Sequence, residues 1–255
     1  MIKLTTNMNF SHSISKGSAQ TREKTAEKLN NQVFQEIISL YKSKKSCDIS
    51  TIKTRYNLIL PERKNINIKA LSAKKYEEYG GSIIIEDNNS SLTGYTIEIP
   101  VSKSKKLNIL DMPEFMHEST HIFDWLLNPK YVANYKKMRE KNIFKKKYYQ
   151  IYTNIYDNAE KILTKDLTVK KTKSAIKNIP LDEKITFLNY IKYRLELEKH
   201  AYKEEVRFAK LMHKHRMPVD SVSFIDFSKY MKIPEKIKII KNIISEEISK
   251  ERKSL

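Results

Sequence analysis

The sequence predicts a mostly helical α+β fold, and three observations support this. Apolar residues recur at helical spacing in several long segments. Four short segments rich in β-branched and aromatic residues are separated by turn residues. An H-E-x-x-H pentapeptide, residues 117–121, follows the last short segment. Together these observations predict a small, largely antiparallel sheet packed beside the helix that carries the pentapeptide, with long helices towards the C-terminus.

The N-terminal half is expected to hold one helix and the whole sheet. Residues 1–19 are rich in Ser, Thr and Asn and are expected to form a flexible arm. A helix is predicted over 20–43, because Leu29, Val33 and Ile37 form an apolar stripe. The predicted strands lie at 56–60, 65–71, 82–87 and 95–101.

The C-terminal half is expected to be nearly all helix. Helices are predicted over 181–213 and 234–252, with a basic connection at 166–180. The tyrosines within 130–165 lie at helical spacing and are interpreted as core residues in preference to a surface for single-stranded nucleic acid. Residues 20–255 are expected to form a single domain, with the first helix and sheet in 20–110 and the helical part with the site in 111–255.

Composition restricts the class of protein. No apolar run approaches the roughly 18 residues of a membrane span. The N-terminus lacks the apolar core of a signal peptide, so we expect a cytoplasmic protein or an effector-like one exported without a classical signal. Cys47 is the only cysteine, which excludes an internal disulfide and a zinc site made of thiolates.

A formal net charge of +19 indicates a basic surface. Lysines are spread along nearly every segment, so a generally basic, solvated surface is favoured over a dedicated nucleic-acid site. A protein or peptide substrate is the expected partner. The sequence leaves the oligomeric state open.

The pentapeptide is the one segment suited to catalysis. On a helix, His117 and His121 lie one turn apart on the same face, and both imidazoles can bind one zinc ion. Glu118 stands beside them, where it could accept a proton from a water bound to the zinc. Asp111 and Pro113 predict a helix start, and Asn128-Pro129 predicts its end, which gives a helix over 112–127.

A catalytic zinc ion needs a third protein ligand. Two carboxylates, Glu198 and Glu205, lie on the otherwise apolar stripe of the helix predicted over 181–213. A buried carboxylate requires a cationic partner, so either residue could be the ligand. Glu198 is the first choice, with Glu205 as the alternative third ligand. Pairing of these carboxylates with Arg194 and Arg207 is the competing explanation.

The segments H117-E-S-T-H121 and E198-K-H-A-Y202 together resemble the zincin metallopeptidases of the gluzincin type. The resemblance covers about 95–212 and implies a zincin-like fold in which Glu198 is the third zinc ligand. It also implies that the strand at 95–101 lies at the edge of the sheet and pairs with an extended substrate backbone. The chain departs from the pattern in its long interval between His121 and Glu198. Tyr202 also stands where those enzymes often carry an acidic residue.

The predicted function is therefore that of a zinc metalloendopeptidase, a hydrolase that cleaves peptide bonds with a zinc-bound water activated by Glu118. Tyr202 or His200 could stabilise the oxyanion, and the sequence leaves this choice open. The alternative is a basic helical binding or structural protein, with nucleic acid or another protein as partner. In that case the H-E-x-x-H motif would be vestigial or incidental.

Overall fold

The computed structural model describes residues 19–44, 47–59, 65–71, 82–88, 91–100, 106–127, 169–219 and 222–254. Its chain divides into two compact units. The first comprises residues 1–128 and 207–220, and the second comprises residues 129–206 and 221–255. Helices account for most of the described residues. The expectations for 1–18 and 130–165 lie outside the described residues.

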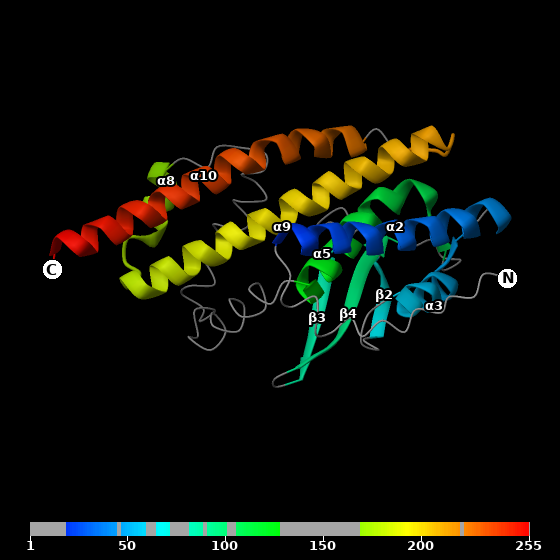
Figure 1. Cartoon of the computed structure of the whole chain (residues 1–255), viewed down its shortest axis with the longest axis horizontal. Helices are drawn as coiled ribbons and strands as arrows, with labels where there is room; N and C mark the ends of the chain where they lie inside the picture. The colour runs from blue at the N-terminus through cyan, green and yellow to red at the C-terminus, as the bar shows by residue number, and fades with distance from the viewer. Residues whose placement is uncertain are drawn as a thin grey trace. The chain divides into compact units, whose positions relative to one another are not determined.

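The first unit is organised around two helices, α2 (Ala19–Lys44) and α5 (Met112–Leu127), which pack against each other (Figure 1). The buried stripe of α2 includes Val33, Phe34 and Ile37, at the spacing of one helical face. The predicted bounds 20–43 and 112–127 agree with these helices to within one residue.

A short helix, α3 (Ile49–Ile59), follows the two-residue strand β1 (Cys47–Asp48), which pairs antiparallel with β5 (Lys106–Leu107). The Asp48 carboxylate accepts hydrogen bonds from the Ser50 hydroxyl at 2.6 Å and the Ser50 backbone N–H at 2.9 Å. These bonds cap the helix and lower the pKa of Asp48.

The strand predicted at 56–60 is wrong, because most of this segment belongs to α3. Ile49, Ile52, Tyr56 and Ile59 continue a helical period into it. The β-branched composition of the segment taken alone concealed this period.

Three strands form the larger sheet, in the order β2 (Asn65–Leu71), β4 (Ser91–Pro100), β3 (Ser82–Asn88). β4 runs parallel to β2 and antiparallel to β3, so the sheet is mixed, whereas the sequence predicted a largely antiparallel one. Ile97, fully buried, lies opposite Ile68 on one neighbour and Ile83 on the other. The helix α5 packs against β4 and β3.

The position of β4 overturns a second expectation. The segment 95–101 was expected to be an edge strand that is free to pair with a substrate. In the structure β4 is the central strand, and its backbone N–H and C=O groups are paired with β2 on one side and β3 on the other. A substrate strand cannot therefore be added along β4.

The entry to α5 is a short 3-10 helix, η2 (Ile109–Asp111), which leads directly into the first turn of α5. The cap that the structure describes at this entry is Asn108, whose side chain accepts a hydrogen bond from the Leu110 N–H at 3.2 Å. Asn108 caps η2, and Asp111, which the sequence predicted as the cap of the helix over 112–127, is the last residue of η2 directly before α5 begins.

A long helix, α9 (Leu181–Lys214), contributes to both units: residues 181–206 belong to the second and residues 207–214 to the first. Within the first unit, the ring of Phe208 lies 4.5 Å from that of Phe34 on α2, measured between centroids. Arg207 donates a hydrogen bond of 2.6 Å to the side chain of Asn31, also on α2.

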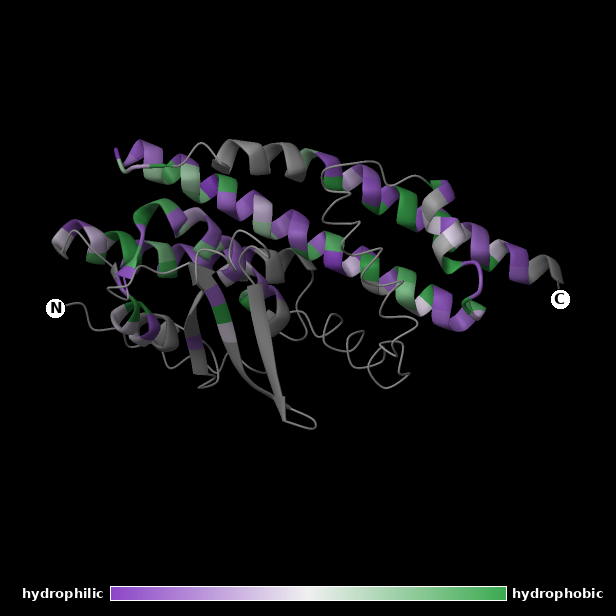
Figure 2. Ribbon diagram, turned by 180° about the vertical axis from the view of Figure 1, so that it is seen from behind, coloured by the Kyte–Doolittle hydropathy of each residue, from purple (hydrophilic) through white to green (hydrophobic). Residues whose placement is uncertain are grey.

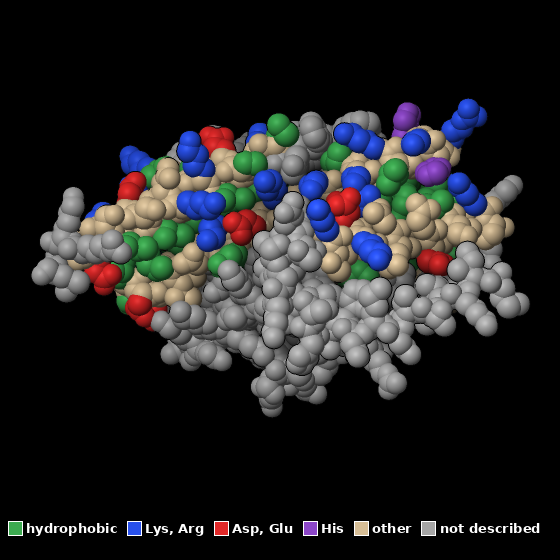
Figure 3. All heavy atoms as spheres, viewed as in Figure 1, with side chains coloured by type: hydrophobic (Ala, Val, Ile, Leu, Met, Phe, Trp, Pro, Cys, Tyr) green, Lys and Arg blue, Asp and Glu red, His purple; other side chains and the backbone are tan. Residues whose placement is uncertain are grey.

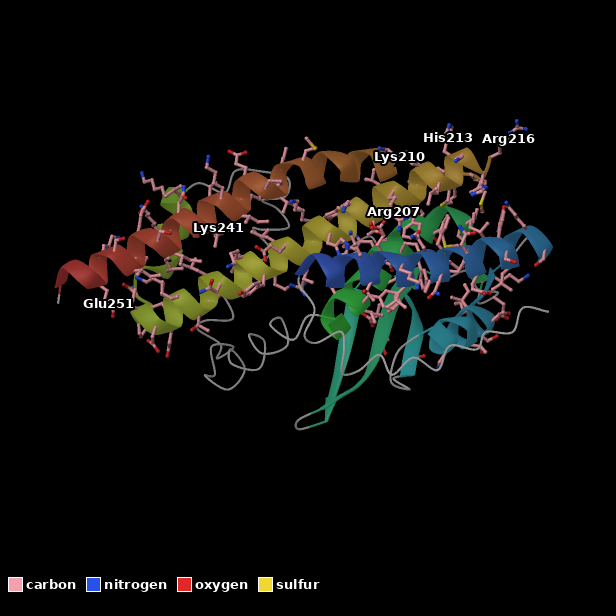
Figure 4. The ribbon with its side chains drawn as sticks, in the orientation of Figure 1. Arg207, Lys210, His213, Arg216, Lys241 and Glu251 are labelled. Atoms are coloured by element: carbon pink, nitrogen blue, oxygen red, sulfur yellow. The ribbon has the colours of Figure 1, made fainter. Side chains whose placement is uncertain are left out.

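The C-terminal end of α9 has the two hydrogen bonds of a Schellman motif. The Met217 N–H donates to the Met212 carbonyl at 3.0 Å, and the Arg216 N–H donates to the His213 carbonyl at 2.9 Å. Met212 and Met217 are both buried, as the hydrophobic contact of this motif requires. Arg216 has φ 57°, the left-handed conformation that glycine normally adopts here. Figure 4 shows its side chain pointing outward from the turn.

The second unit contains α8 (Val169–Ile176), residues 181–206 of α9 and α10 (Val222–Ser254). α10 runs alongside α9 in Figures 1 and 2. The hydrophobic core of the second unit is aliphatic apart from one phenylalanine. It consists of Ile176, Ile179, Phe187, Leu188, Ile191, Leu195, Ile233, Ile237, Ile240 and Ile243.

Ion pairs accompany this core. Lys184 on α9 bonds Glu247 on α10 at 2.7 Å, and Lys173 on α8 pairs with Glu246. Two expectations are corrected here. The segment 166–180, expected to be a connection, contains α8. The helix predicted to start at Pro234 starts instead at Val222, with Pro234 in its interior.

Lysine and arginine side chains are distributed along the visible face of the described residues, as Figure 3 shows. None of the described helices combines the length and the apolar character that crossing a membrane requires. The single domain predicted over 20–255 stays a prediction.

Candidate metal centre

The helix α5 carries its polar pentapeptide in a buried position. Residues 115–123 are all buried, and within them His117 and His121 are each 7% exposed and Glu118 is 6% exposed. Removing imidazoles and a carboxylate from water costs free energy unless they bond a partner. A helix that serves packing alone would carry apolar residues at these positions, so this burial is the first sign of a functional site.

The two imidazoles face each other through the same ring atom. Their Nε2 atoms are 3.2 Å apart, with ring centroids 4.9 Å apart and planes at 82°. Without a metal, one Nε2 can carry a proton and donate to the other. With zinc, both Nε2 lone pairs would point at the ion. Two nitrogens at about 2.0–2.1 Å from a tetrahedral zinc ion are roughly 3.3 Å apart, so the observed separation also suits chelation.

A carboxylate completes the set of potential ligands. His117, His121 and Glu198 each offer one ligand atom, and these atoms all lie within 4.8 Å of one another. Both histidines are buried, and Glu198 on α9 is half-buried. This is the one group of three His, Cys, Asp or Glu ligands found among the described residues, and it does not include Glu205.

The continuity of α9 bears on the position of Glu198. Residues 181–214 form one uninterrupted helix, and Arg207 and Phe208 near its end contact α2. A helix rises about 1.5 Å per residue, so Glu198 lies roughly 14 Å along the same helix from these contacts. Arg207 and Phe208 belong to the first unit and Glu198 to the second, so these contacts with α2 are not part of the candidate metal centre.

Glu198 also has a cationic neighbour on its own helix. Arg194, one turn earlier, approaches it with Nη2···Oε1 at 3.5 Å. This is the pairing that the sequence offered as the competing explanation, and the structure contains it. The contact is long for a charge-assisted hydrogen bond, which usually measures about 2.7–2.9 Å. It engages the Oε1 atom of the Glu198 carboxylate.

The remaining predicted residues differ in their placement on α9. Tyr202 stands one turn after Glu198 and shares its face, and it is half-buried against the core of the second unit. His200, two positions after Glu198, lies on a different face of the helix. Helix geometry therefore favours Tyr202 over His200 as a neighbour of the carboxylate. Glu205 is buried two turns beyond Glu198.

The donor set suits zinc chemically. Two neutral imidazoles and one carboxylate are a known combination of protein ligands for a catalytic zinc ion, leaving one position open. Two ligand atoms of one zinc ion lie at most about 4.2 Å apart. The ligand atoms of His117, His121 and Glu198 are up to 4.8 Å apart, so a side chain must move slightly before all three can bind one ion. Rotation of the half-buried Glu198 side chain can supply it.

Sequence reasoning missed one residue of this region, Asn30 on α2. Its side chain is fully buried and bonds Ser119 and Thr120, the two inner residues of the pentapeptide. A signal was present, because Asn30 lies between Leu29 and Val33 on the apolar stripe of the first helix. A buried amide on such a stripe requires hydrogen-bonding partners.

Comparisons with known proteins add no relative to this description. No protein-family model, no curated protein and no solved structure matches the chain. The case for the metal centre therefore depends on the residues and the geometry described above.

Proposed function

We propose that this chain is a zinc-dependent metallopeptidase, with His117, His121 and Glu198 as the metal ligands and Glu118 as the general base. The observation that carries the proposal is the pair of buried imidazoles with Nε2 atoms 3.2 Å apart, grouped with a carboxylate. The buried Glu118 beside them supports a catalytic role over a purely structural metal site. The resemblance of the two motifs to the gluzincins supports a peptide substrate.

When bound, zinc would act as a Lewis acid that polarises the substrate carbonyl and makes water more acidic. The protein's own groups would carry the proton. The Glu118 carboxylate would accept a proton from the attacking water and donate it to the nitrogen of the leaving amine. Tyr202, on the same face of α9 as Glu198, is the proposed donor to the carbonyl oxygen as negative charge develops there.

Metal content and hydrolysis, measured on the same preparations, test the catalytic assignment. We expect about one zinc ion per chain in the unchanged protein and in Glu118→Gln. Hydrolysis of a peptide library, followed by mass spectrometry, should fall by about 10²–10⁴-fold in the variant, because only the proton transfer is lost. Absence of stoichiometric zinc at neutral pH would refute the proposal and favour the alternative of a basic binding protein.

A matched pair of variants tests the third ligand. Glu198→Gln should weaken zinc binding, whereas Glu205→Gln, at a buried position on the same helix, should leave it unchanged. The measurement is zinc affinity by competition with a chromophoric chelator. The opposite result would make Glu205 the ligand. If both variants bind zinc as the unchanged chain does, the protein ligands are the histidines alone, and a structural or incidental site is the better explanation.

A further inference from the structure

A buried hydrogen-bond network joins α2 to the back of the metal-binding pentapeptide, and both helices belong to the first unit. Asn30 on α2 donates from Nδ2 to Thr120 Oγ1 at 2.8 Å. The Ser119 hydroxyl donates to Asn30 Oδ1 at 3.1 Å. One amide therefore holds both residues that separate Glu118 from His121.

The direction of each bond in this network is determined. The Thr120 hydroxyl donates to the Met116 carbonyl at 2.7 Å, so its single proton is used there. Thr120 must then accept from Asn30, which places the amide nitrogen towards Thr120 and the amide oxygen towards Ser119. The reverse orientation of the amide would bring two acceptors together at Thr120.

The network holds the back and one flank of α5 relative to the face that carries the histidines. At about 100° per residue, His117 and His121 point in nearly the same direction, Ser119 points to the opposite side of the helix, and Thr120 lies on the flank between them. The apolar packing of the buried faces of α2 and α5 is not directional. The hydrogen bonds of Asn30 are directional, so they can fix the rotation and the axial position of α5 where packing alone cannot.

We propose that Asn30 is a positioning residue of the metal site, which orients the imidazoles of His117 and His121 by fixing α5 from behind. This inference rests on the proposed function, since it assumes that the imidazoles bind a metal. Metal ligation tolerates errors of only about 0.2 Å in ligand distance, and a supporting group that is lost typically lowers metal affinity by about 10–100-fold.

The chain provides a matched control in the next residue. Asn31 also lies on α2 and also makes a side-chain hydrogen bond, but it accepts from Arg207 at 2.6 Å and does not bond α5 in the described structure. Asn30→Ala and Asn31→Ala both remove one buried or half-buried amide from the same helix. Only the first removes a contact to the pentapeptide.

The experiment compares the full-length chain with these variants after removal of metal. Zinc affinity is measured by chelator competition, and the visible absorption of bound Co²⁺ reports the geometry of the site. Asn30→Ala should weaken zinc binding by about tenfold or more and change the Co²⁺ spectrum. Asn31→Ala should leave both unchanged even where it lowers the melting temperature by a similar amount. Equal effects of the two variants on zinc affinity would overturn the proposal.

Substitutions at Thr120 provide a second test if Asn30→Ala does not fold. Thr120→Val removes the hydroxyl while keeping the shape and should reproduce the loss of affinity. Thr120→Ser retains the hydroxyl and should restore both the affinity and the Co²⁺ spectrum. If the unchanged chain binds no zinc, the proposed function fails. If it binds zinc and folded Asn30 and Thr120 variants bind equally well, only the positioning role fails.

Discussion

At the scale of single residues, this chain places ionisable groups in buried positions in two different ways. His117, Glu118 and His121 are buried together on one helix, where a shared metal ion would explain them. Lys236 on α10 is buried without such an explanation: it is 6% exposed, and its Nζ has no hydrogen-bond partner within the described part of the chain. The first arrangement suits a site. The second predicts that the buried ammonium group of Lys236 lowers the stability of the fold.

Burial lowers the pKa of Lys236 to about 8, and the nearby Lys232 adds to the effect. The unfolded chain holds this proton up to the ordinary value of 10.5, so the unfolded state binds more protons between pH 8 and 10.5. Stability should therefore rise with pH across this window and be lowest below pH 8.

Lys236→Met should remove this dependence and stabilise the protein at neutral pH by about 2 kcal/mol, after allowance for solvent screening. The measurement is urea unfolding at pH 7 and pH 10. Lys238→Met, at an exposed position on the same helix, is the control and should change little. A loss of stability in Lys236→Met at pH 7 would show that the ammonium group has a stabilising partner.

At the scale of helices and strands, the ends of α9 show how local chemistry compensates for composition. The first turn carries Asp182 and Glu183 and the last turn His213 and Lys214, which complement the helix dipole. The Schellman motif that follows requires a left-handed residue. The chain has only four glycines, and here Arg216 occupies that position at φ 57°.

Arg216→Gly should stabilise the protein by about 1 kcal/mol, because glycine adopts this conformation without the steric cost of a Cβ atom. The side chain is exposed, so its removal sacrifices little packing. Thermal unfolding measures the effect, with Arg216→Ala as the control that removes the same charge but keeps Cβ. Destabilisation by glycine beyond that by alanine would contradict the conformational argument.

The contact between α9 and α10 includes a paired carboxylate. Glu247 accepts hydrogen bonds of 2.7 Å from both Lys184 and Lys250, which lower its pKa below the ordinary value of 4.5. A carboxyl group with a lowered pKa stabilises the folded state above its unfolded pKa, and this contribution is lost as the pH falls through the folded value. The relevant window therefore lies below pH 4.5.

Glu247→Gln should cost about 1 kcal/mol at pH 7 and less at pH 3, because below the ordinary value of 4.5 the unfolded chain already holds the proton. Chemical unfolding at the two pH values is the measurement. Glu246→Gln serves as the matched control, because the Glu246 side chain is 47% exposed and its pairing with Lys173 is solvated. An equal loss at both pH values would show that the charge of Glu247 does not contribute.

At the scale of the whole molecule, the proposed metal would bind ligands that lie far apart in the sequence, two on α5 and one on α9. A ligand that binds only the folded chain stabilises it in proportion to the logarithm of its concentration over Kd. Zinc at 100 times Kd should therefore add about 2.7 kcal/mol, or roughly 5–10 °C in melting temperature.

Differential scanning calorimetry with and without zinc checks this prediction. His121→Ala should lose the zinc-dependent rise, whereas His215→Ala, at an exposed position after α9, should keep it. A rise of equal size in His121→Ala would place the stabilising zinc elsewhere in the chain.

Much of the helical structure could be predicted because its signals are local. The helix at 112–127 has a start signal, an apolar period and a Pro stop within its own sequence, and the structure reproduces these bounds. The strand predicted at 56–60 was wrong because the composition of this segment favours a strand, whereas the helix that begins at Ile49 continues through it to Ile59. The helix start predicted at Pro234 was wrong for a related reason. Proline is common at helix starts, but here α10 continues through Pro234, and Ile233 and Ile237 on either side of it pack into the core.

The sequence by itself determined His117, Glu118 and His121, since helical spacing alone brings two imidazoles to one face. The sequence favoured Glu198 over Glu205, which lies two turns further along the same face of one helix, and the third ligand stays a proposal. It could not identify β4 as a central strand, or Asn30 as the partner of Ser119 and Thr120. Only the tertiary structure decided these points, because they depend on which distant segments pack together, and the local periodicity of a sequence carries no record of that.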